Sequence, residues 1–245
     1  MESAQDPVIC HACWISGTAI QNNISAQKSV SRLDMPQKLF DLDADFFSEQ
    51  FYSHNPLPTI FSLVSSVHPT TSSVKISPQT RAKAVYCLSA ALKHWPGAID
   101  SLSNDSNRGW AILREGLRDP EVTIRRKIAF LLDMLIRQGG EGPTGEEGMQ
   151  RTVQAIQKNG IVDGLVSSLT NPLPVGANGD DEPDWDLQEK SFAALMSAEK
   201  AGALNSENKA ALKQVVENWG KMSGGWENVG LSDSEAQEAI VTLSS

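Results

Sequence analysis

This 245-residue chain lacks the long apolar runs of a membrane protein. Its longest such stretch, from Ile128 to Ile136, contains Asp133 and falls far short of the roughly 20 residues that a membrane-spanning helix needs. The first residues, from Met1 to Asp6, contain neither a basic segment nor an apolar core, so no signal peptide is readable. We therefore expect no membrane span and no secretion.

Positive charge is also scarce, since 21 Lys and Arg residues stand against 30 Asp and Glu residues and give a formal net charge of −9. Such a balance disfavours attraction to nucleic acid and to anionic lipid, and we expect neither as a partner. The charge is unevenly spread, because residues 75–137 contain 11 basic and 6 acidic residues, whereas residues 138–190 contain 3 and 10. One part of the chain is therefore expected to attract an acidic protein partner.

Cysteine and histidine, which build most redox and metal sites, number only three and four. Cys10 and Cys13 have the C-x-x-C spacing of thioredoxin-like enzymes, but no second pair completes a zinc site and no βαβ pattern surrounds them. We interpret them as structural thiols of a protein from a reducing compartment, and expect a cytoplasmic location.

Signatures of catalysis are likewise missing. The acidic segment 41–45 begins like a calcium-binding EF-hand loop, but Phe46 and Tyr52 occupy positions that require Gly and Glu. The glycine-rich stretch 139–148 lacks the Gly-Lys-Ser/Thr of a phosphate-binding loop, and no Gly-x-Ser-x-Gly elbow occurs. The sequence thus predicts a protein that is not an enzyme and that uses no metal or cofactor.

Strict alternation of apolar and polar residues, typical of β-strands, is almost absent, whereas helical spacing recurs along the whole chain. The clearest apolar stripe consists of Ile124, Ile128, Leu131, Leu132 and Leu135. Similar stripes occur in residues 57–64, 85–92, 110–117, 162–169 and 212–219. We therefore predict an all-α protein of many short helices, each with one side buried.

Internal repetition indicates how these helices are arranged. A shift of 72 residues places Trp14 on Tyr86, a further 44 places Tyr86 on Phe130, and a further 63 places Lys127 on Lys190. The spacing of 44 lies in the range of HEAT and armadillo units, whose helices stack side by side. The predicted fold is an armadillo/HEAT-like right-handed α-solenoid.

The repeats also predict a domain organisation. An armadillo-like repeat domain is expected over residues 1–222, interrupted by an irregular insertion at about residues 31–55. Residues 223–245 are expected to form a C-terminal tail with one short helix, because Ser232 and Glu235 have the spacing of a capping box.

One segment resembles a known family. The run from Cys10 to Asn23 contains Gly17-Thr18-Ala19-Ile20-Gln21-Asn22-Asn23, which is similar to the Gly-Thr-Ala-x-Gln-Asn-Asn signature of the Fes-type nucleotide exchange factors. Residues 119–132 resemble a later repeat of the same family, and residues 186–195 resemble its final repeat. The family normally begins with a further helical segment and a first repeat, which we expect this chain to lack.

The resemblance implies an armadillo-like co-chaperone that binds the ATPase domain of cytosolic heat-shock protein 70. Factors of this family embrace one lobe of that domain and displace it from the other, which opens the cleft and releases ADP. The resemblance implies no cofactor in the exchange factor itself. We further expect the chain to be a monomer.

Candidate partner-binding residues lie first on the helix that carries the signature. Trp14, Thr18 and Asn22 form one stripe at helical spacing, opposite an apolar side that is expected to include Ala12 and Cys13. We predict that this stripe lines the binding face.

Later repeats add further candidates. Tyr86 and Phe130 take the place of the tryptophan, and Lys83 begins a parallel basic ladder. Both aromatic residues either line the binding face or pack between repeats, since aromatic side chains are mostly buried. Arg125 and Arg126 stand near a helix start, where the helix dipole disfavours cations, so we expect an anionic partner to explain at least one of them, with solvated helix faces as the alternative.

The alternative function is a general armadillo scaffold that grips an extended peptide or another protein. Nuclear-import adaptors hold peptides with a Trp ladder and an Asn one helical turn after each Trp. Here the residues four positions after the ladder aromatics are Thr18, Ala90 and Met134. The Asn array that would hold a peptide backbone is missing, which favours the exchange-factor interpretation.

Overall fold

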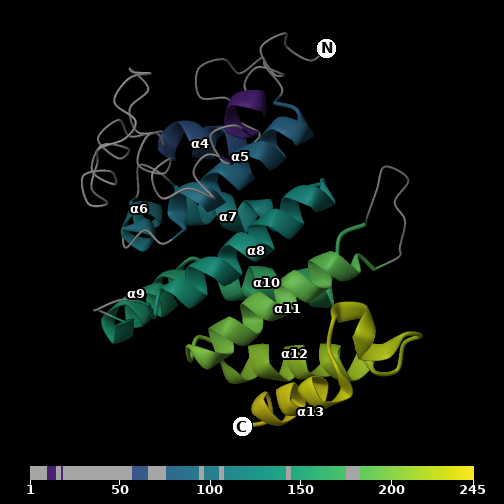
Figure 1. Ribbon diagram of the computed structural model, residues 1–245. Helices are drawn as coiled ribbons and strands as arrows, with labels where there is room; N and C mark the ends of the chain where they lie inside the picture. Colours follow the sequence, from purple (N-terminus) through teal and green to yellow (C-terminus); the bar gives the residue numbers. More distant parts are fainter. Residues whose placement is uncertain are drawn as a thin grey trace. The chain divides into compact units, whose positions relative to one another are not determined.

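The computed structural model describes residues 10–14, 18, 57–65, 76–93, 97–104, 108–141, 145–174 and 183–245. Every regular element in these ranges is helical, as predicted (Figure 1). Asn22, most of the Gly-Thr-Ala signature and the expected insertion at 31–55 lie outside the described residues. None of the helices in the described ranges is long and apolar enough to cross a bilayer.

The described elements follow one another as short helices, and residues 10–14 are helical as well. In chain order they are α4 (Leu57–Val64), α5 (Pro78–Leu92), α6 (Ala98–Ser103), α7 (Gly109–Gly116), α8 (Val122–Gln138), α9 (Gly145–Lys158), α10 (Ile161–Thr170), α11 (Trp185–Lys200), α12 (Ser206–Trp219), the 3-10 helix η1 (Gly225–Val229) and α13 (Asp233–Thr242). They form two compact units, residues 1–112 and 113–245.

In the first unit, α4 packs against α5. The apolar residues of the predicted stripe in α4 are buried, and so are Val85, Leu88 and Leu92 of α5. Helix α5 begins at Pro78, where the hydroxyl of Ser77 accepts a hydrogen bond from the Thr80 amide at 3.2 Å. Proline at the first helical position and a serine cap together explain why the helix starts there.

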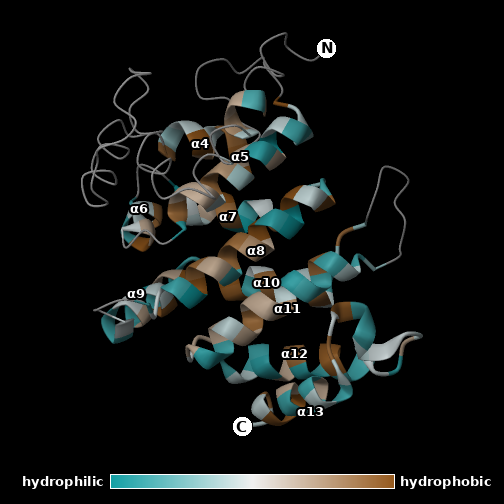
Figure 2. Ribbon diagram, in the orientation of Figure 1, coloured by the Kyte–Doolittle hydropathy of each residue, from teal (hydrophilic) through white to brown (hydrophobic). Residues whose placement is uncertain are grey.

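The second unit is built around α8 and α11, which contact each other more extensively than any other pair of helices in the described chain. Helix α10 packs against α11 and α12, α9 lies against α8 and α10, and α13 packs on α12 (Figure 1). Each of these helices carries both hydrophobic and hydrophilic positions (Figure 2). The apolar sides meet in one core, which is the packing expected of stacked amphipathic helices.

The predicted stripe of α8 is confirmed as core. Ile124 is 1% exposed, and Ile128, Leu131, Leu132 and Leu135 are fully buried. The helix begins at Val122, just after Pro120, so the proline ends the preceding turn and the helix follows it.

The predicted stripe of α12 is also buried, and Trp219 anchors it to α11. Its ring lies edge-on to Phe192 with centroids 5.4 Å apart, and its indole N–H donates to the side-chain oxygen of Gln188 at 2.6 Å. A buried indole with its N–H satisfied contributes both area and orientation to the core.

The residues after α12 pack onto it. The Trp226 indole N–H donates to the Val216 carbonyl at 2.7 Å, and the ring lies so close to Gly220 that a Cβ there would stand 2.7 Å from it. The predicted last helix is confirmed as α13, with the Ser232–Glu235 capping box present. The division at residue 222 stays a prediction, but η1 and α13 are docked on α11 and α12.

Three details of the fold were not foreseen from the sequence, and the first is helix α6, which no predicted stripe covers. Helix α9 was not predicted, because only Thr152, Ala155 and Ile156 of it are buried and its apolar stripe is short. Ala12, expected on the buried side of the first helix, is exposed, whereas Cys13 is buried as expected and Cys10 is buried too.

Adjacent residues of α8 offer a direct test of this core. Leu131→Ala should lower the free energy of unfolding by about 2–5 kcal/mol, because it removes a fully buried side chain and leaves a cavity. Phe130→Ala, at a position 49% exposed, should cost about 1 kcal/mol or less. Urea unfolding followed by circular dichroism measures both, and equal losses would contradict the assignment of these two positions.

Candidate partner-binding surfaces

The predicted site residues divide by exposure. Trp14 and Phe130 are each 49% exposed, which is unusual for large aromatic side chains. Thr18 is exposed, whereas Lys83 and Tyr86 are half-buried. Phe130 thus lies at the surface, and its place in a binding face stays a prediction.

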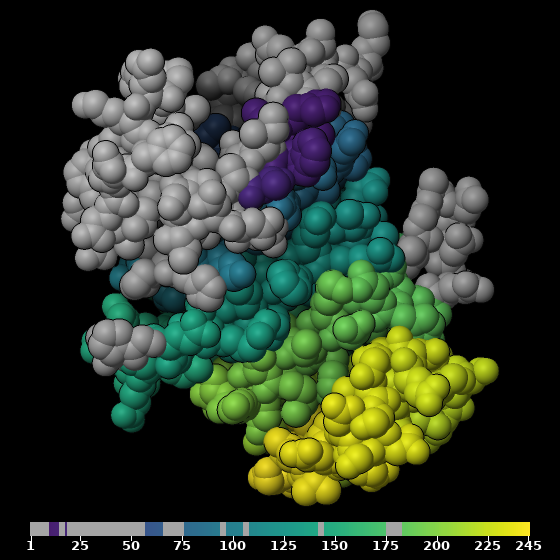
Figure 3. Space-filling model, viewed as in Figure 1, coloured from purple at the N-terminus to yellow at the C-terminus, as the bar shows by residue number. Residues whose placement is uncertain are grey.

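In the first unit, the helical residues 10–14 form part of the molecular surface (Figure 3). The Lys83 ammonium lies 5.4 Å from the centre of the Trp14 ring, a distance at which a cation–π attraction operates. Lys83 thus partly orders the exposed ring. We define the exposed Trp14 ring, with Lys83 and Thr18, as the tryptophan surface.

Buried thiols underlie this surface. Burial raises the pKa of Cys87, on α5, to about 12, and Cys13 adds to the shift. Burial, with a smaller effect from Cys10, also raises the pKa of Cys13. Thiols held in the protonated form are poor nucleophiles, in keeping with the structural role predicted for Cys13. The described ranges contain no group of three or more His, Cys, Asp or Glu residues that could hold a metal.

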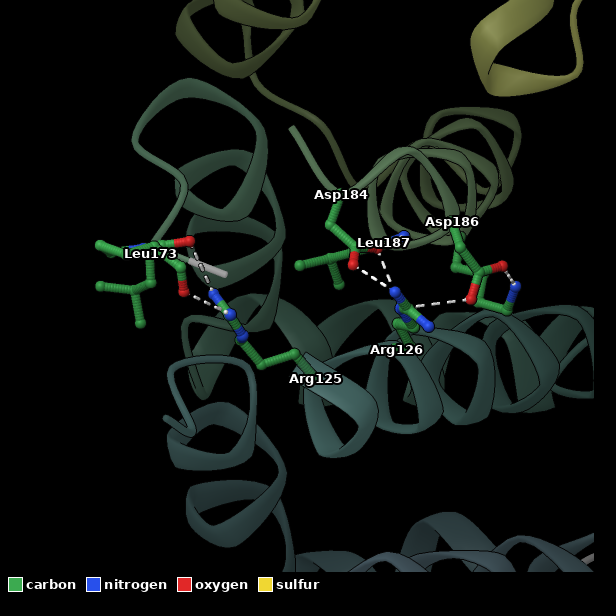
Figure 4. A network of polar contacts seen from close by, with 8 residues as sticks. Arg125, Arg126, Leu173, Asp184, Asp186 and Leu187 are labelled. Carbon is green, nitrogen blue, oxygen red and sulfur yellow. Dashed lines mark hydrogen bonds and ion pairs between the residues drawn. The ribbon is translucent and has the colours of Figure 1, made fainter. Parts of the chain in front are cut away.

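In the second unit, the prediction that Arg125 is available to a partner is wrong. The residue is 1% exposed, and its guanidinium donates to the carbonyl oxygens of Leu173 and Pro174 at 3.1 and 3.0 Å (Figure 4). Burial lowers the pKa of Arg125, against the opposing effect of the Asp184 charge. Carbonyl groups of the chain itself, and not an external anion, therefore receive this cation.

Arg126 also finds its anion within the chain. Its guanidinium grips both carboxylate oxygens of Asp184, with Nε 2.9 Å from Oδ1, and lies 3.4 Å from the carboxylate of Asp186 (Figure 4). Asp186 in turn pairs with Lys190 one turn along α11. The side chain of Arg126 remains 35% exposed, so it borders the surface, but it is not an unpaired charge awaiting a partner.

Asp184 is the centre of this network, which the sequence did not reveal. It caps α11, accepting a 2.7 Å hydrogen bond from the Leu187 amide. Burial by itself would raise the pKa of Asp184, but the fork from Arg126 and the Leu187 amide outweigh it, so the pKa lies below its usual range. The only signal in the sequence was an Asp directly before a helical stretch, which indicates a cap but not its arginine.

Phe130 lies one helical turn after Arg126 on α8. The position equivalent to it on α11 under the 63-residue shift is Ala193, which is also exposed. We define the exposed sides of α8 and α11 around Phe130 and Ala193 as the phenylalanine surface. Arg126 and Lys190 in this neighbourhood are paired with Asp184 and Asp186, and the exposed aromatic ring is its distinctive feature.

Comparison with known sequences agrees with the family resemblance. The chain is 33% identical over 231 residues to a protein named Hsp70 nucleotide exchange factor FES1 from Cryptococcus neoformans var. neoformans, covering 89% of this chain and 53% of the relative. It is 29% identical over 234 residues to the protein of the same name from Mycosarcoma maydis, covering 76% and 52%. The chain thus spans about half the length of the curated relatives it matches. No protein-family model matches it.

Comparison with solved structures confirms the fold class. A designed armadillo repeat protein in complex with the peptide (KR)4 aligns with 97% of this chain and 77% of its own, with a TM-score of 0.56 and 14% identity. A second designed armadillo repeat protein aligns with 98% of this chain and 95% of its own, with a TM-score of 0.51 and 13% identity. At these identities the likeness concerns the fold alone.

The lowered pKa of Asp184 predicts how stability depends on pH. The carboxylate stabilises the fold fully above its unfolded pKa of about 3.9, and this contribution is lost as the pH falls through the lower folded value. Asp184→Asn, which retains a helix-capping side chain, should therefore be less stable than wild type at pH 7, with a difference that shrinks below about pH 4. Urea unfolding across this range measures it, and a difference independent of pH would contradict the role of the charge.

Proposed function

Because the chain is a homologue of proteins named Hsp70 nucleotide exchange factor, we propose that it acts as a nucleotide exchange factor for a cytosolic heat-shock protein 70. It binds the ATPase domain of that chaperone and promotes the release of ADP. The observation that carries the proposal is the 33% identity over 89% of this chain, together with an armadillo-like fold.

The mechanism requires differential affinity. The exchange factor binds the open conformation of the ATPase domain more tightly than the closed, nucleotide-bound one, so binding shifts the chaperone toward the open state. Linkage then demands that nucleotide weaken the binding of the exchange factor by the same factor. Exchange by this mechanism needs binding alone, and this chain makes or breaks no covalent bond. We propose that it is a cytoplasmic monomer and not an enzyme.

Two exposed aromatic residues support a protein partner. Trp and other aromatic side chains carry a large share of the binding energy at interfaces, and an ordered ring loses little entropy on binding. Trp14 is exposed and held by Lys83, and Phe130 is exposed on a helix whose opposite side is rigidly buried. We propose that the tryptophan and phenylalanine surfaces contact the chaperone.

The same features disfavour the peptide-scaffold alternative. A peptide backbone needs polar side chains at regular intervals beside the aromatic ladder. One turn after Tyr86 and Phe130 stand Ala90, which is buried, and Met134, and neither offers an amide. The acidic overall charge likewise disfavours nucleic acid and anionic membranes as partners.

Nucleotide release tests the proposed activity. We expect this protein to accelerate the dissociation of fluorescent ADP from a purified cytosolic heat-shock protein 70, and added ATP to dissociate the complex. Stopped-flow fluorescence measures the first effect and gel filtration the second. Unchanged ADP release at a saturating concentration of the folded protein, verified by circular dichroism, would exclude the proposed activity.

Substitution of the exposed aromatics tests the proposed surfaces. Trp14→Ala and Phe130→Ala should each weaken binding to the ATPase domain by about 2 kcal/mol, because exposed anchors contribute to the complex far more than to the fold. Met222→Ala, at a residue 43% exposed after α12, serves as the matched control and should leave affinity unchanged. Calorimetric titration measures binding. If a substitution lowers the melting temperature instead of weakening binding, the ring it removes contributes to the fold and not to the interface.

A further inference from the structure

Consecutive arginines at the start of α8 contact both sides of the connection between α10 and α11. Arg125 binds the carbonyl oxygens of Leu173 and Pro174, which follow α10. Arg126 binds Asp184, which caps α11 (Figure 4). Residues 175–182, between these contacts, lie outside the described residues. Contacts 48 to 58 residues away in the sequence thus converge on one turn of α8.

This arrangement carries a large desolvation cost for the stability that it provides. A buried guanidinium loses its hydration, and Nε of Arg125 has no hydrogen-bond partner to compensate for that loss. Both arginines also stand near the positive end of the α8 dipole. Well-packed apolar side chains often stabilise a fold as well as buried ion pairs do, so the network is better explained by the specific position that it imposes.

The network fixes where α11 lies along the length of α8. The fork between Arg126 and Asp184 joins the starts of the two helices, and the Ser197 hydroxyl donates to Asp133 at 2.7 Å further along both. The two helices therefore run in the same direction, side by side. Apolar contacts alone are non-directional and tolerate sliding, whereas a bidentate fork specifies distance and angle.

We propose that Arg126 and Asp184, supported by Arg125, are positioning residues that hold the start of α11 against α8 and thereby set the shape of the phenylalanine surface. The proposal rests on the proposed function, because it makes affinity for the chaperone depend on a network that the chaperone does not touch. Phe130 stands one turn from Arg126, and Ala193 two turns after Asp186, so a shift of α11 changes the spacing between them.

The test uses the full chain and two independent measurements. Amide hydrogen exchange of residues 185–190, measured without any partner, reports whether the start of α11 is held. Calorimetric titration with the ATPase domain of a cytosolic heat-shock protein 70 reports affinity. The variants are Arg126→Gln, Asp184→Asn, which keeps a capping side chain, and Arg126→Lys, which keeps the charge but loses the fork.

We expect faster exchange at the start of α11 and roughly two- to thirtyfold weaker binding in each variant, the range over which residues remote from a ligand modulate affinity. Arg126→Gln combined with Asp184→Asn should lose no more than either single change, because both remove the same fork. Phe130→Ala combined with either change should lose less than the sum of the separate losses, because the fork acts through the surface that contains Phe130. Lys213→Gln, a charge loss at a half-exposed i,i+4 pair on α12, should change neither measurement.

The outcomes separate this proposal from the proposed function. Unchanged exchange at residues 185–190 would show that the fork does not hold α11, and faster exchange with unchanged affinity would show that its position is irrelevant to binding. If Arg126→Lys keeps the full affinity, the charge at this position is sufficient and the bidentate fork is not needed, which would contradict the positioning role. If the wild-type chain fails to bind the ATPase domain, the proposed function falls, and hydrogen exchange alone still decides whether the fork holds α11.

Discussion

Burial of one side of α8 is the constraint on which the second unit depends. Ile128, Leu131, Leu132 and Leu135 lose all contact with water, and α11 supplies much of the surface that covers them. Burial of apolar area is the largest favourable term in folding, but it is non-directional. We therefore infer that polar contacts at the two ends of this interface set the position of α11 along α8.

On α8, Phe130 is exposed, and two arginines of the same helix are paired within the chain. Arg126 is held by Asp184 and Asp186, and Arg137 by Asp133 at 2.5 Å, so these two cations are matched within the chain. An uneven distribution of charge along a sequence need not become an uneven surface. What remains exposed is the aromatic ring, which is the feature that a protein partner recognises best.

In the proposed function, α8 serves stability through its buried side and partner binding through its exposed side. A solenoid-like stack can bury every helix on its neighbours and still present one line of side chains to a partner. The proposed exchange activity needs such a binding surface and no reactive group on this chain. Burial raises the pKa of the Cys13 and Cys87 thiols, which is in keeping with a structural role for them.

The sequence by itself determined the helical class, the buried stripes of α4, α5, α8 and α12, the capping box before α13 and the resemblance to the family. These properties are encoded locally, because helical periodicity and caps involve residues three to four positions apart. Only the tertiary structure decided that Phe130 is exposed, that Arg125 is buried and that Arg126 is paired with Asp184. The partners of these arginines lie in a connection with no periodic pattern, and only the packing of α11 beside α8 brings them together.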